Sequence, residues 1–396
     1  RTLRYHGVPI TSGGQLRGCC APWRMEWDMV RITADWLRAR PTQSILSMLV
    51  DGGWQAFAVG GCVRDSLLNR PVKDIDIATD ARPDEVVRLA EAHGFHAIPT
   101  GIDHGTVTVV ADHMPHEITT FRRDVETDGR RAVVAFSDRM IDDARRRDFT
   151  MNALYADRSG KVSDPIGGLP DLEARRIRFI EDAPMRIRED YLRSLRFFRF
   201  HAWYGDAGQG FDPDAMAAIS ENVDGLELLS RERVGAEVKR LLAAPDPVSA
   251  VAGMRSTGVL QAILPGTDDR ALGPLVHLEA THGVKPDPIR RLASFGGQGV
   301  ATALRLSRKE AGQLAALTKD MGALPAHELG YRHGAGTARD ILLLEAAATG
   351  SLLDETRLIR ARDGADQTFS MKAADLMPEV QGPALGACLS RLEQDW

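Results

Sequence analysis

The pattern of hydrophobic and polar positions in the first part of the chain predicts short strands that alternate with helices. Apolar runs at Ala56–Val59 and Ile75–Ala78 are typical of buried strands. Two β-rich runs, Gly105–Ala111 and His116–Phe121, are separated by Asp-His-Met-Pro and predict a hairpin. Helices are expected at 31–52 with an interruption at Pro41, at 63–68, and from Pro83 onward.

After about Ala156 the pattern changes to helical periodicity, which continues to the end of the sequence. We therefore predict an α/β head followed by an all-α remainder. Helices are expected at 184–204, 213–223, 230–244 and 247–257. The expected division is a leader at 1–24 that is disordered or spurious, a head at 25–160, a helical neck at 161–245, and a helical body and tail at 246–396.

The most informative polar pattern directly follows the first predicted strand. Gly60 and Gly61 form a turn, Arg64 lies at the start of a helix, and Asp74 and Asp76 follow about a dozen residues later. Glycine lets the backbone approach a triphosphate closely and offer N–H groups to it. Carboxylates at i and i+2 of an extended segment point to one face and can bind a divalent metal together. This order of residues predicts nucleotidyl transfer.

Glu117 is a candidate third carboxylate, because it lies on the second strand of the predicted hairpin. If that strand pairs near Asp74 and Asp76, the three side chains supply about the number of carboxylates that two Mg²⁺ ions need. The alternative is that Glu117 is a half-exposed strand residue without a role in catalysis.

Two arginine-containing segments downstream are candidates for binding the rest of a nucleotide. Arg147 lies in a dense polar stretch and has the fork geometry that suits phosphate oxygens. Asp190 and Arg193, three residues apart on a predicted helix, are expected to be neighbours. A carboxylate beside a guanidinium complements the base edges of cytosine and adenine, with roughly 1–3 kcal/mol of discrimination. The alternative, which the spacing alone favours, is an intrahelical ion pair worth about 0.3–0.5 kcal/mol.

Composition places limits on these interpretations. The 396 residues carry a net charge of −5, so the protein does not have an overall basic surface. Its basic residues are grouped in arginine clusters instead, which suggests binding of phosphates at a defined site. The four cysteines (Cys19, Cys20, Cys62 and Cys388) form neither a disulfide framework nor a CxxC pair, which fits the cytoplasm. No apolar run approaches the ~20 residues of a membrane span, so no membrane association is expected.

Five stretches between about residues 56 and 245 occur in a fixed order. They are Gly60–Asp65 with Asp74–Asp76, Arg146–Ala153, Asp164–Asp171, Glu189–Arg193, and Ser230–Val234 with Glu237. Together they resemble the motifs of class II nucleotidyltransferases, the family of bacterial CCA-adding tRNA nucleotidyltransferases and poly(A) polymerases. The resemblance implies a head with a nucleotidyltransferase-type mixed β-sheet and flanking helices, a neck with a nucleobase-recognition motif, and an RNA-binding body and tail.

The resemblance also implies roles for single residues and partners. Asp74 and Asp76 are the implied metal carboxylates, while Glu117 is a catalytic candidate on its strand position alone. The implied nucleotide-binding residues are Gly60, Gly61, Arg64, Arg147, Asp190, Arg193, Arg196 and Arg199. The implied reaction is attack by an RNA 3′-hydroxyl on CTP or ATP at a two-Mg²⁺ site. The implied partner is tRNA, bound at its acceptor end and elbow, and no stable protein partner is evident.

Several activities occur within the family. Residues 122–138 resemble the flexible loop needed for adding the final A, which argues against a CC-adding enzyme. The chain has no basic extension of the kind that nonspecific RNA binding by a poly(A) polymerase favours. CCA addition is therefore expected, with poly(A) or A-only addition as the alternative. A non-catalytic RNA- or nucleotide-binding protein is the alternative from another class, although it would be expected to have lost Asp74 and Asp76.

Overall fold

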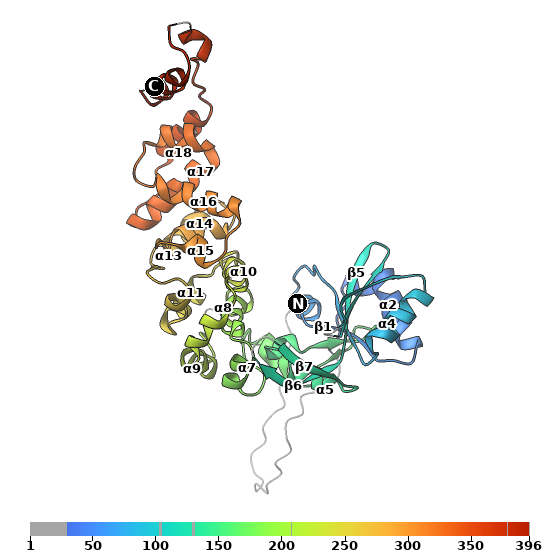
Figure 1. Cartoon of the computed structure of the whole chain (residues 1–396). Helices are drawn as coiled ribbons and strands as arrows, with labels where there is room; N and C mark the ends of the chain where they lie inside the picture. Colours follow the sequence, from blue (N-terminus) through green and yellow to red (C-terminus); the bar gives the residue numbers. More distant parts are fainter. Residues whose placement is uncertain (1–29, 103–104, 129–130, 207, 378, 396) are drawn as a thin grey trace, which may run out of the picture.

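The structure is a computed structural model that describes residues 30–102, 105–128, 131–206, 208–377 and 379–395. It consists of an α/β head joined to a long helical arm, so that the molecule is bent and elongated (Figure 1). The leader expected at 1–24 lies outside the described residues.

The head is built on a mixed sheet whose described strands follow the order β3-β4-β5-β2-β1-β8-β9. The strands are β1 (Ala56–Val59), β2 (Asp76–Thr79), β3 (His96–Gly101), β4 (Thr106–Ala111), β5 (Met114–Thr120), β8 (Tyr155–Ala156) and β9 (Val162–Ser163). β2 and β5 run parallel, and the other neighbours run antiparallel. This arrangement confirms the expected α/β head with a mixed sheet.

The predicted hairpin is confirmed as β4 and β5. Its turn residues Asp112 and His113 both have positive φ, 47° and 64°, as a tight two-residue hairpin turn requires. β3 was not expected, because Pro99 and Gly101 interrupt its pattern. It lies at the edge of the sheet and contains a register shift, which is where a strand tolerates proline.

Helices cover one face of this sheet. The helices of the head are α1 (Asp35–Arg38), α2 (Arg40–Asp51), α3 (Gly61–Leu67), α4 (Pro83–Ala92) and α5 (Met140–Arg145). α2 and α4 pack against the strands, where Ile77, Val107 and Ile118 are buried (Figure 1). The break expected at Pro41 lies instead at Ala39, because proline fits the first turn of α2, where its missing N–H has no partner to lose.

Residues 122–138, expected as a flexible loop, form an antiparallel ribbon over their described part. Its strands are β6 (Arg122–Asp128) and β7 (Arg131–Phe136). The ribbon lies beside α5 at the base of the head (Figure 1).

The arm is helical throughout its described residues, and its helices follow one another away from the head (Figure 1). They are α6 (Gly168–Glu173), α7 (Ala183–Glu189), α8 (Leu192–Tyr204), α9 (Pro213–Glu221), α10 (Arg231–Leu242), α11 (Val248–Ser256), α12 (Val259–Ile263), α13 (Leu272–Thr281), α14 (Pro288–Ala293), α15 (Val300–Ala303), α16 (Arg308–Lys319), α17 (Ala326–Thr349), α18 (Glu355–Ala365) and α19 (Pro383–Asp395). The helices predicted at 213–223, 230–244 and 247–257 are confirmed as α9, α10 and α11. The domain boundaries at 160 and 245 stay a prediction.

The single helix predicted at 184–204 is wrong. The backbone of Asp190 is extended, with φ −155° and ψ 103°, and it separates α7 from α8. The Asp190 carboxylate accepts a hydrogen bond from the backbone N–H of Leu192 at 3.1 Å, in the first turn of α8. A short aspartate side chain can satisfy a helix start in this way, so the break is locally stable.

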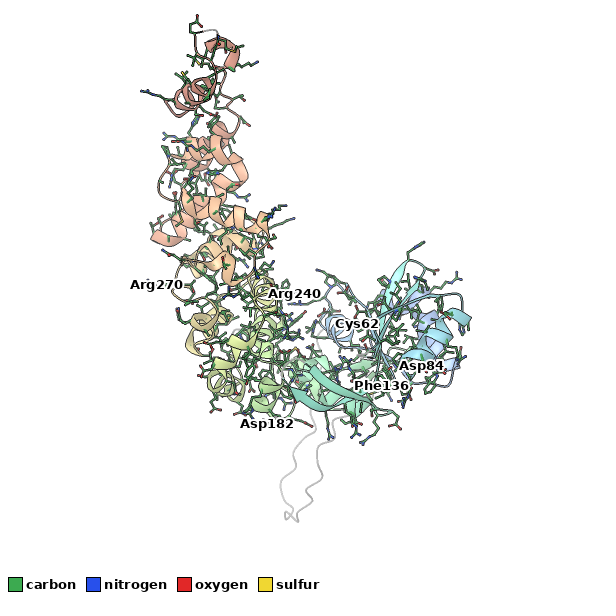
Figure 2. The ribbon with its side chains drawn as sticks, viewed as in Figure 1. Cys62, Asp84, Phe136, Asp182, Arg240 and Arg270 are labelled. Atoms are coloured by element: carbon green, nitrogen blue, oxygen red, sulfur yellow. The ribbon has the colours of Figure 1, made fainter. Side chains whose placement is uncertain are left out.

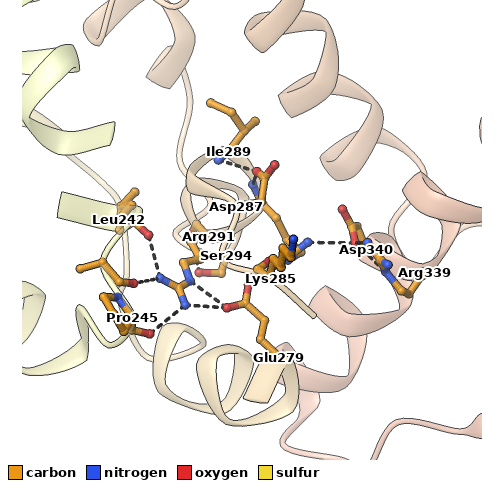
Figure 3. A network of polar contacts seen from close by, with 12 residues as sticks. Leu242, Pro245, Glu279, Lys285, Asp287, Ile289, Arg291, Ser294, Arg339 and Asp340 are labelled. Carbon is orange, nitrogen blue, oxygen red and sulfur yellow. Dashed lines mark hydrogen bonds and ion pairs between the residues drawn. The ribbon is translucent and has the colours of Figure 1, made fainter. Parts of the chain in front are cut away.

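A buried ionic network of the arm lies between the apolar cluster that continues from the head into the arm and a second cluster within the arm (Figure 3). Glu279 accepts hydrogen bonds from Arg290 Nε at 2.9 Å and Arg291 Nε at 2.8 Å. Arg291 also donates to the carbonyl of Leu242, at the end of α10, at 2.7 Å. Arg290 pairs with Asp340 of α17 at 3.0 Å, so the network links α10, α13, α14 and α17.

None of the helices in the described part of the chain is both long enough and apolar enough to cross a lipid bilayer.

Candidate active site

A polar cavity of about 400 Å³ lies where the head meets the first helices of the arm. Its walls come from the turn before α3, from the segment between α5 and β8, and from α8 and α10. The lining residues are Gly60, Gly61, Arg64, Asp76, Arg146, Arg147, Asp148, Asn152, Asp190, Leu192, Arg193, Arg196, Phe200 and Arg233. Figure 2 helps to find this region, because it labels Cys62 in α3 on the head and Arg240 in α10 on the arm.

The turn at the start of α3 requires glycine. Gly60 has φ 74° and ψ −122°, and a Cβ added there would lie 3.2 Å from Nη1 of Arg147. Its backbone N–H donates to the carbonyl of Leu154 at 3.1 Å, which ties the turn to the segment beside it. The absence of a side chain lets the backbone lie directly against the cavity.

Arg64 is held firmly although it lines the cavity. Its Nη1 donates to Oδ1 of Asn152 at 2.6 Å, its Nη2 to the hydroxyl of Tyr204 at 2.7 Å, and its Nε to Asp65 at 2.9 Å. Its guanidinium lies 4.0 Å from the centre of the Tyr204 ring. Nη2 also lies 2.9 Å from Oδ1 of Asp65, so each of the three guanidinium nitrogens has a partner that fixes the orientation of the group.

Arg147 is oriented by a buried carboxylate. Its Nε and Nη2 donate to Oδ2 of Asp143 at 3.2 and 2.9 Å, and the Tyr155 hydroxyl donates to the same oxygen at 2.8 Å. Burial alone would raise the pKa of Asp143, but the guanidinium groups of Arg147 and Arg146 hold that pKa below its usual value. Asp143 therefore stays ionised and fixes Arg147 against the glycine turn.

The candidate carboxylates lie on the face of the sheet opposite α2 and α4. Asp76 and Glu117 are direct register partners on the parallel strands β2 and β5, which confirms the predicted pairing. Thr108 of β4 is the next partner on the same face. Burial raises the pKa of Asp76, and the negative charges of Glu117 and Asp74 raise it further, while Arg147 lowers it. Asp76 thus lies close enough to Glu117 and to Asp74 to feel the negative charge of both.

These carboxylates also line a second cavity of about 220 Å³, which shares Asp76 with the larger one. Its lining residues are Trp36, Val72, Lys73, Asp74, Ile75, Asp76, Thr108, Met114, Pro115 and Glu117.

The carboxylates fit a divalent cation that arrives with a nucleotide. In the described residues no three His, Cys, Asp or Glu side chains already converge as a complete set of metal ligands. Mg²⁺ is commonly bound by one or two carboxylates while water and substrate phosphates fill the other positions. A cation would also relieve the repulsion that raises the pKa of Asp76.

The intrahelical ion pair considered for Asp190 and Arg193 is not formed. Oδ2 of Asp190 accepts a hydrogen bond from Nη2 of Arg233 in α10 at 2.6 Å. Arg193 donates instead to Glu189 and, at 2.8 Å, to the carbonyl of Arg186. Both side chains nevertheless line the larger cavity.

Arg196 and Arg199 differ in position. Arg196 lines the cavity and donates to Asp148, which also accepts from Nδ2 of Asn152 at 2.9 Å. Burial opposes ionisation of Asp148, but Arg196 and Asn152 hold its pKa well below the usual range. Arg199 donates to Glu237 of α10 at 2.5 Å and does not line the cavity.

Arg233 was missed as a cavity residue, although it lies in the predicted stretch Ser230–Val234. Its contact with Asp190 spans 43 residues of sequence. The only sequence signal was its place in that stretch, because no local spacing relates the two side chains.

Comparison with known proteins gives two family matches. Residues 56–178 match the poly A polymerase head domain, and residues 210–270 match the probable RNA and SrmB-binding site of polymerase A. The first match contains the glycine turn, the carboxylates and Arg147, and the second contains Arg233.

Similar proteins agree with these matches. The chain is 40% identical over 228 residues to a CCA-adding enzyme of Geobacillus thermodenitrificans, which covers 57% of this chain and 54% of that protein. It is 39% identical over 201 residues to the mitochondrial CCA tRNA nucleotidyltransferase 1 of Homo sapiens, which covers 50% and 46%. The aligned region therefore spans about half the length of the curated relatives that it matches.

A solved structure matches over a greater length. It is the CCA-adding enzyme of Bacillus stearothermophilus in complex with CTP, with a TM-score of 0.69 and 29% identity over 89% of this chain and 91% of that one. The head-domain match, the geometry of the site and this structural similarity agree with one another, since the same fold carries the same motifs in each comparison. Residues 56–178 of the chain thus match the poly A polymerase head domain, and the chain as a whole is similar in fold to CCA-adding enzymes.

Proposed function

We propose that the protein is a CCA-adding tRNA nucleotidyltransferase, which adds C, C and A from CTP and ATP to the 3′ end of tRNA. The observation that carries this proposal is one cavity in which the carboxylate Asp76 faces phosphate-binding arginines and the pair Asp190 and Arg193. The names of the relatives, CCA-adding enzymes among them, support the same activity.

The chemistry is an attack by the RNA 3′-hydroxyl oxygen on the α-phosphorus of the nucleotide. A new O3′–Pα bond forms, the bond between the α-phosphorus and the bridging oxygen breaks, and pyrophosphate leaves. Arg64 and Arg147 are held by Asn152 and Asp143, so their remaining donors are oriented before the nucleotide arrives. Oriented donors stabilise the charge that builds on the transferring phosphoryl group without reorganising.

Asp74, Asp76 and Glu117 are the residues that would hold Mg²⁺ at a two-metal site. Such cations would lower the pKa of the attacking hydroxyl and neutralise the triphosphate.

Base selection is assigned to Asp190 and Arg193. Asp190 accepts the amino proton that cytosine and adenine present, and Arg193 donates to the neighbouring ring nitrogen. Arg233 fixes the Asp190 carboxylate, so the acceptor is in position before the base enters. Uracil and guanine present a carbonyl beside the Asp190 carboxylate and an N–H beside the Arg193 donor, so neither hydrogen bond can form.

Two other functions remain as alternatives, and we expect the cytoplasm as the location. Poly(A) or A-only addition uses the same cavity, and a non-catalytic RNA- or nucleotide-binding protein uses the same fold.

The deciding experiment supplies purified protein and Mg²⁺ with tRNA that lacks its 3′ end, and with labelled CTP and ATP separately and together. Ordered incorporation of C, C and A that then stops is the expected result. Long A tracts on unrelated RNA would indicate a poly(A) polymerase. No incorporation at all would indicate the non-catalytic protein.

A further inference from the structure

The smaller cavity beside the carboxylates has a lining of mixed chemistry. It combines the carboxylates Asp76 and Glu117 with the apolar side chains of Trp36, Met114 and Pro115. Trp36 comes from α1 and lies N-terminal to residues 56–178, which match the head-domain family.

The Trp36 ring is held in place at the cavity. Its indole N–H donates to the hydroxyl of Ser66 in α3 at 2.8 Å. The Ser66 hydroxyl in turn donates to the backbone carbonyl of Cys62 at 2.7 Å. The half-buried ring is therefore anchored to the same helix that begins at the glycine turn, and it is oriented before any ligand binds.

The two cavities that share Asp76 differ in what they can bind. The larger one is lined by arginines and suits a polyanion. Of the described residues that line the smaller one, none is an arginine, and the indole of Trp36 lines it together with the carboxylates. At about 220 Å³ it is smaller than the roughly 300–1,000 Å³ typical of sites for a whole small molecule. It therefore suits one end of a larger molecule.

We propose that the smaller cavity receives the terminal nucleoside of the RNA acceptor strand, with its base stacked on Trp36 and its 3′-hydroxyl beside Asp76. This inference rests on the proposed function, which requires an RNA hydroxyl to meet the nucleotide at Asp76. Lys73, an exposed lysine that lines the same cavity, can pair with the phosphate that precedes this nucleoside.

Stacking on an aromatic ring also explains how one cavity serves successive additions. The terminal base of the acceptor changes after each nucleotide is added, so a site that reads a base edge would reject some of its substrates. Every base has a π-face, so stacking tolerates all of them. Selection is then confined to the incoming nucleotide in the larger cavity.

The test compares Trp36→Ala, Trp36→Phe and Leu228→Ala in the full-length protein. Leu228 is 78% exposed in the arm and serves as a control for loss of an apolar side chain. Trp36→Ala is expected to raise the KM for shortened tRNA roughly 5- to 100-fold, the effect of losing one base–aromatic stack, and to leave the KM for CTP within about twofold. Trp36→Phe keeps a ring and is expected to recover most of the loss.

An equal KM for RNA in wild type and Trp36→Ala would overturn the proposal. So would an equal rise in the KM values for RNA and CTP, because that result indicates a structural defect. Thermal unfolding of each variant checks that it folds.

A crosslinking experiment tests the proposal without turnover. Shortened tRNA that ends in 5-iodocytidine is bound to the wild-type protein, irradiated and digested. A crosslinked peptide that contains Trp36 or Met114 is expected, and crosslinks confined to peptides of the arm would contradict the proposal. Lack of incorporation by wild type would refute the proposed function, while the crosslink still decides where the RNA end lies.

Discussion

At the scale of single residues, Asp190 has two structural contacts that the spacing of the motif does not reveal. One carboxylate oxygen satisfies the start of α8, and the other is bound by Arg233. Because both oxygens are engaged, the side chain cannot rotate freely, and its direction into the cavity depends on α10. The residue that would read the base is therefore oriented by Arg233 of α10, 43 residues further along the chain.

Arg233→Ala is expected to weaken base selection more than catalysis. Without its partner, Asp190 can adopt other rotamers, so preference for CTP over UTP should fall roughly tenfold, within the 1–3 kcal/mol that such a contact supplies. Incorporation assays with each nucleotide measure the ratio of kcat/KM values. Arg231→Ala, which removes an exposed arginine from the same helix, is the control, and an unchanged ratio in Arg233→Ala would refute this role.

Asp74→Ala is expected to reduce incorporation by roughly a hundredfold or more, the scale on which one electrostatic contributor affects catalysis. RNA binding, measured by electrophoretic mobility shift, should persist because Asp74 is a small part of the surface that RNA would contact. Asp84→Ala, at an exposed aspartate of α4, controls for the change in charge. Full activity of Asp74→Ala would exclude it as a metal ligand.

At the scale of elements, prediction succeeded where the hydrophobic pattern alone determines the structure. β1, β2, β4 and β5 bury alternating or continuous apolar residues, and their positions follow from that pattern. β3 was missed because an edge strand tolerates proline and glycine. The break at Asp190 was missed because apolar spacing continues through it, and because one of the two contacts of its side chain, with Arg233, spans 43 residues of sequence.

At the candidate site, too, contacts between residues far apart in the sequence could not be predicted. The role expected of Glu117 depended on its strand pairing near Asp76. The parallel register of β2 and β5 confirms this pairing. The partners that hold the arginines, such as Asp148 for Arg196 and Glu237 for Arg199, were not predicted. An ion pair between distant elements leaves no periodic signal, so only the packed structure reveals it.

The start of α16 provides a test of pH dependence at this scale. Ser307 and Glu310 form a capping box, and Glu310 also pairs with Lys239 of α10 at 2.7 Å. The hydrogen bonds from Lys239 and from the backbone N–H of Ser307 lower the pKa of Glu310 to about 2. The resulting stabilisation is fully present above the ordinary glutamate pKa and is lost as the pH falls from about 4.5 towards 2.

Glu310→Gln is therefore expected to lower the free energy of unfolding by about 1 kcal/mol at pH 7, a value reduced for solvent screening of the pair. The difference from wild type should shrink between pH 5 and about 3. Denaturant titrations across this range measure it, with Glu173→Gln at an exposed site in α6 as the control. A difference that does not change with pH would show that the charge of Glu310 plays no part.

At the scale of the whole molecule, one apolar cluster extends from the head into the arm, a second lies within the arm, and the network around Glu279 lies where they meet (Figure 3). Glu279, Arg290 and Arg291 are almost completely buried. Burying charges is unfavourable unless each is paired, so the pairs fix the geometry of this junction more than they add stability. The link from α10 to α17 thus holds the distal helices at a set angle to the helix that carries Arg233.

Glu279→Gln is expected to destabilise the protein by about 3–5 kcal/mol, because it leaves two buried guanidinium groups with too little negative charge nearby. The midpoint of denaturant unfolding measures this loss. Glu232→Gln is the matched control, since its ion pair with Arg305 is exposed and should contribute less than about 1 kcal/mol. Equal midpoints for the two variants would show that the network does not stabilise the junction.

The ion pairs around the larger cavity have a consequence for how a nucleotide reaches it. Each arginine among its described lining residues is in contact with a carboxylate, so the wall offers many hydrogen-bond donors but carries little net charge. A balanced wall produces a weak long-range potential and does not steer anions from a distance. Encounter with the nucleotide should therefore depend little on ionic strength, and free phosphate or other small anions should gain no advantage from charge alone. Discrimination begins only at contact, where the geometry of the donors decides.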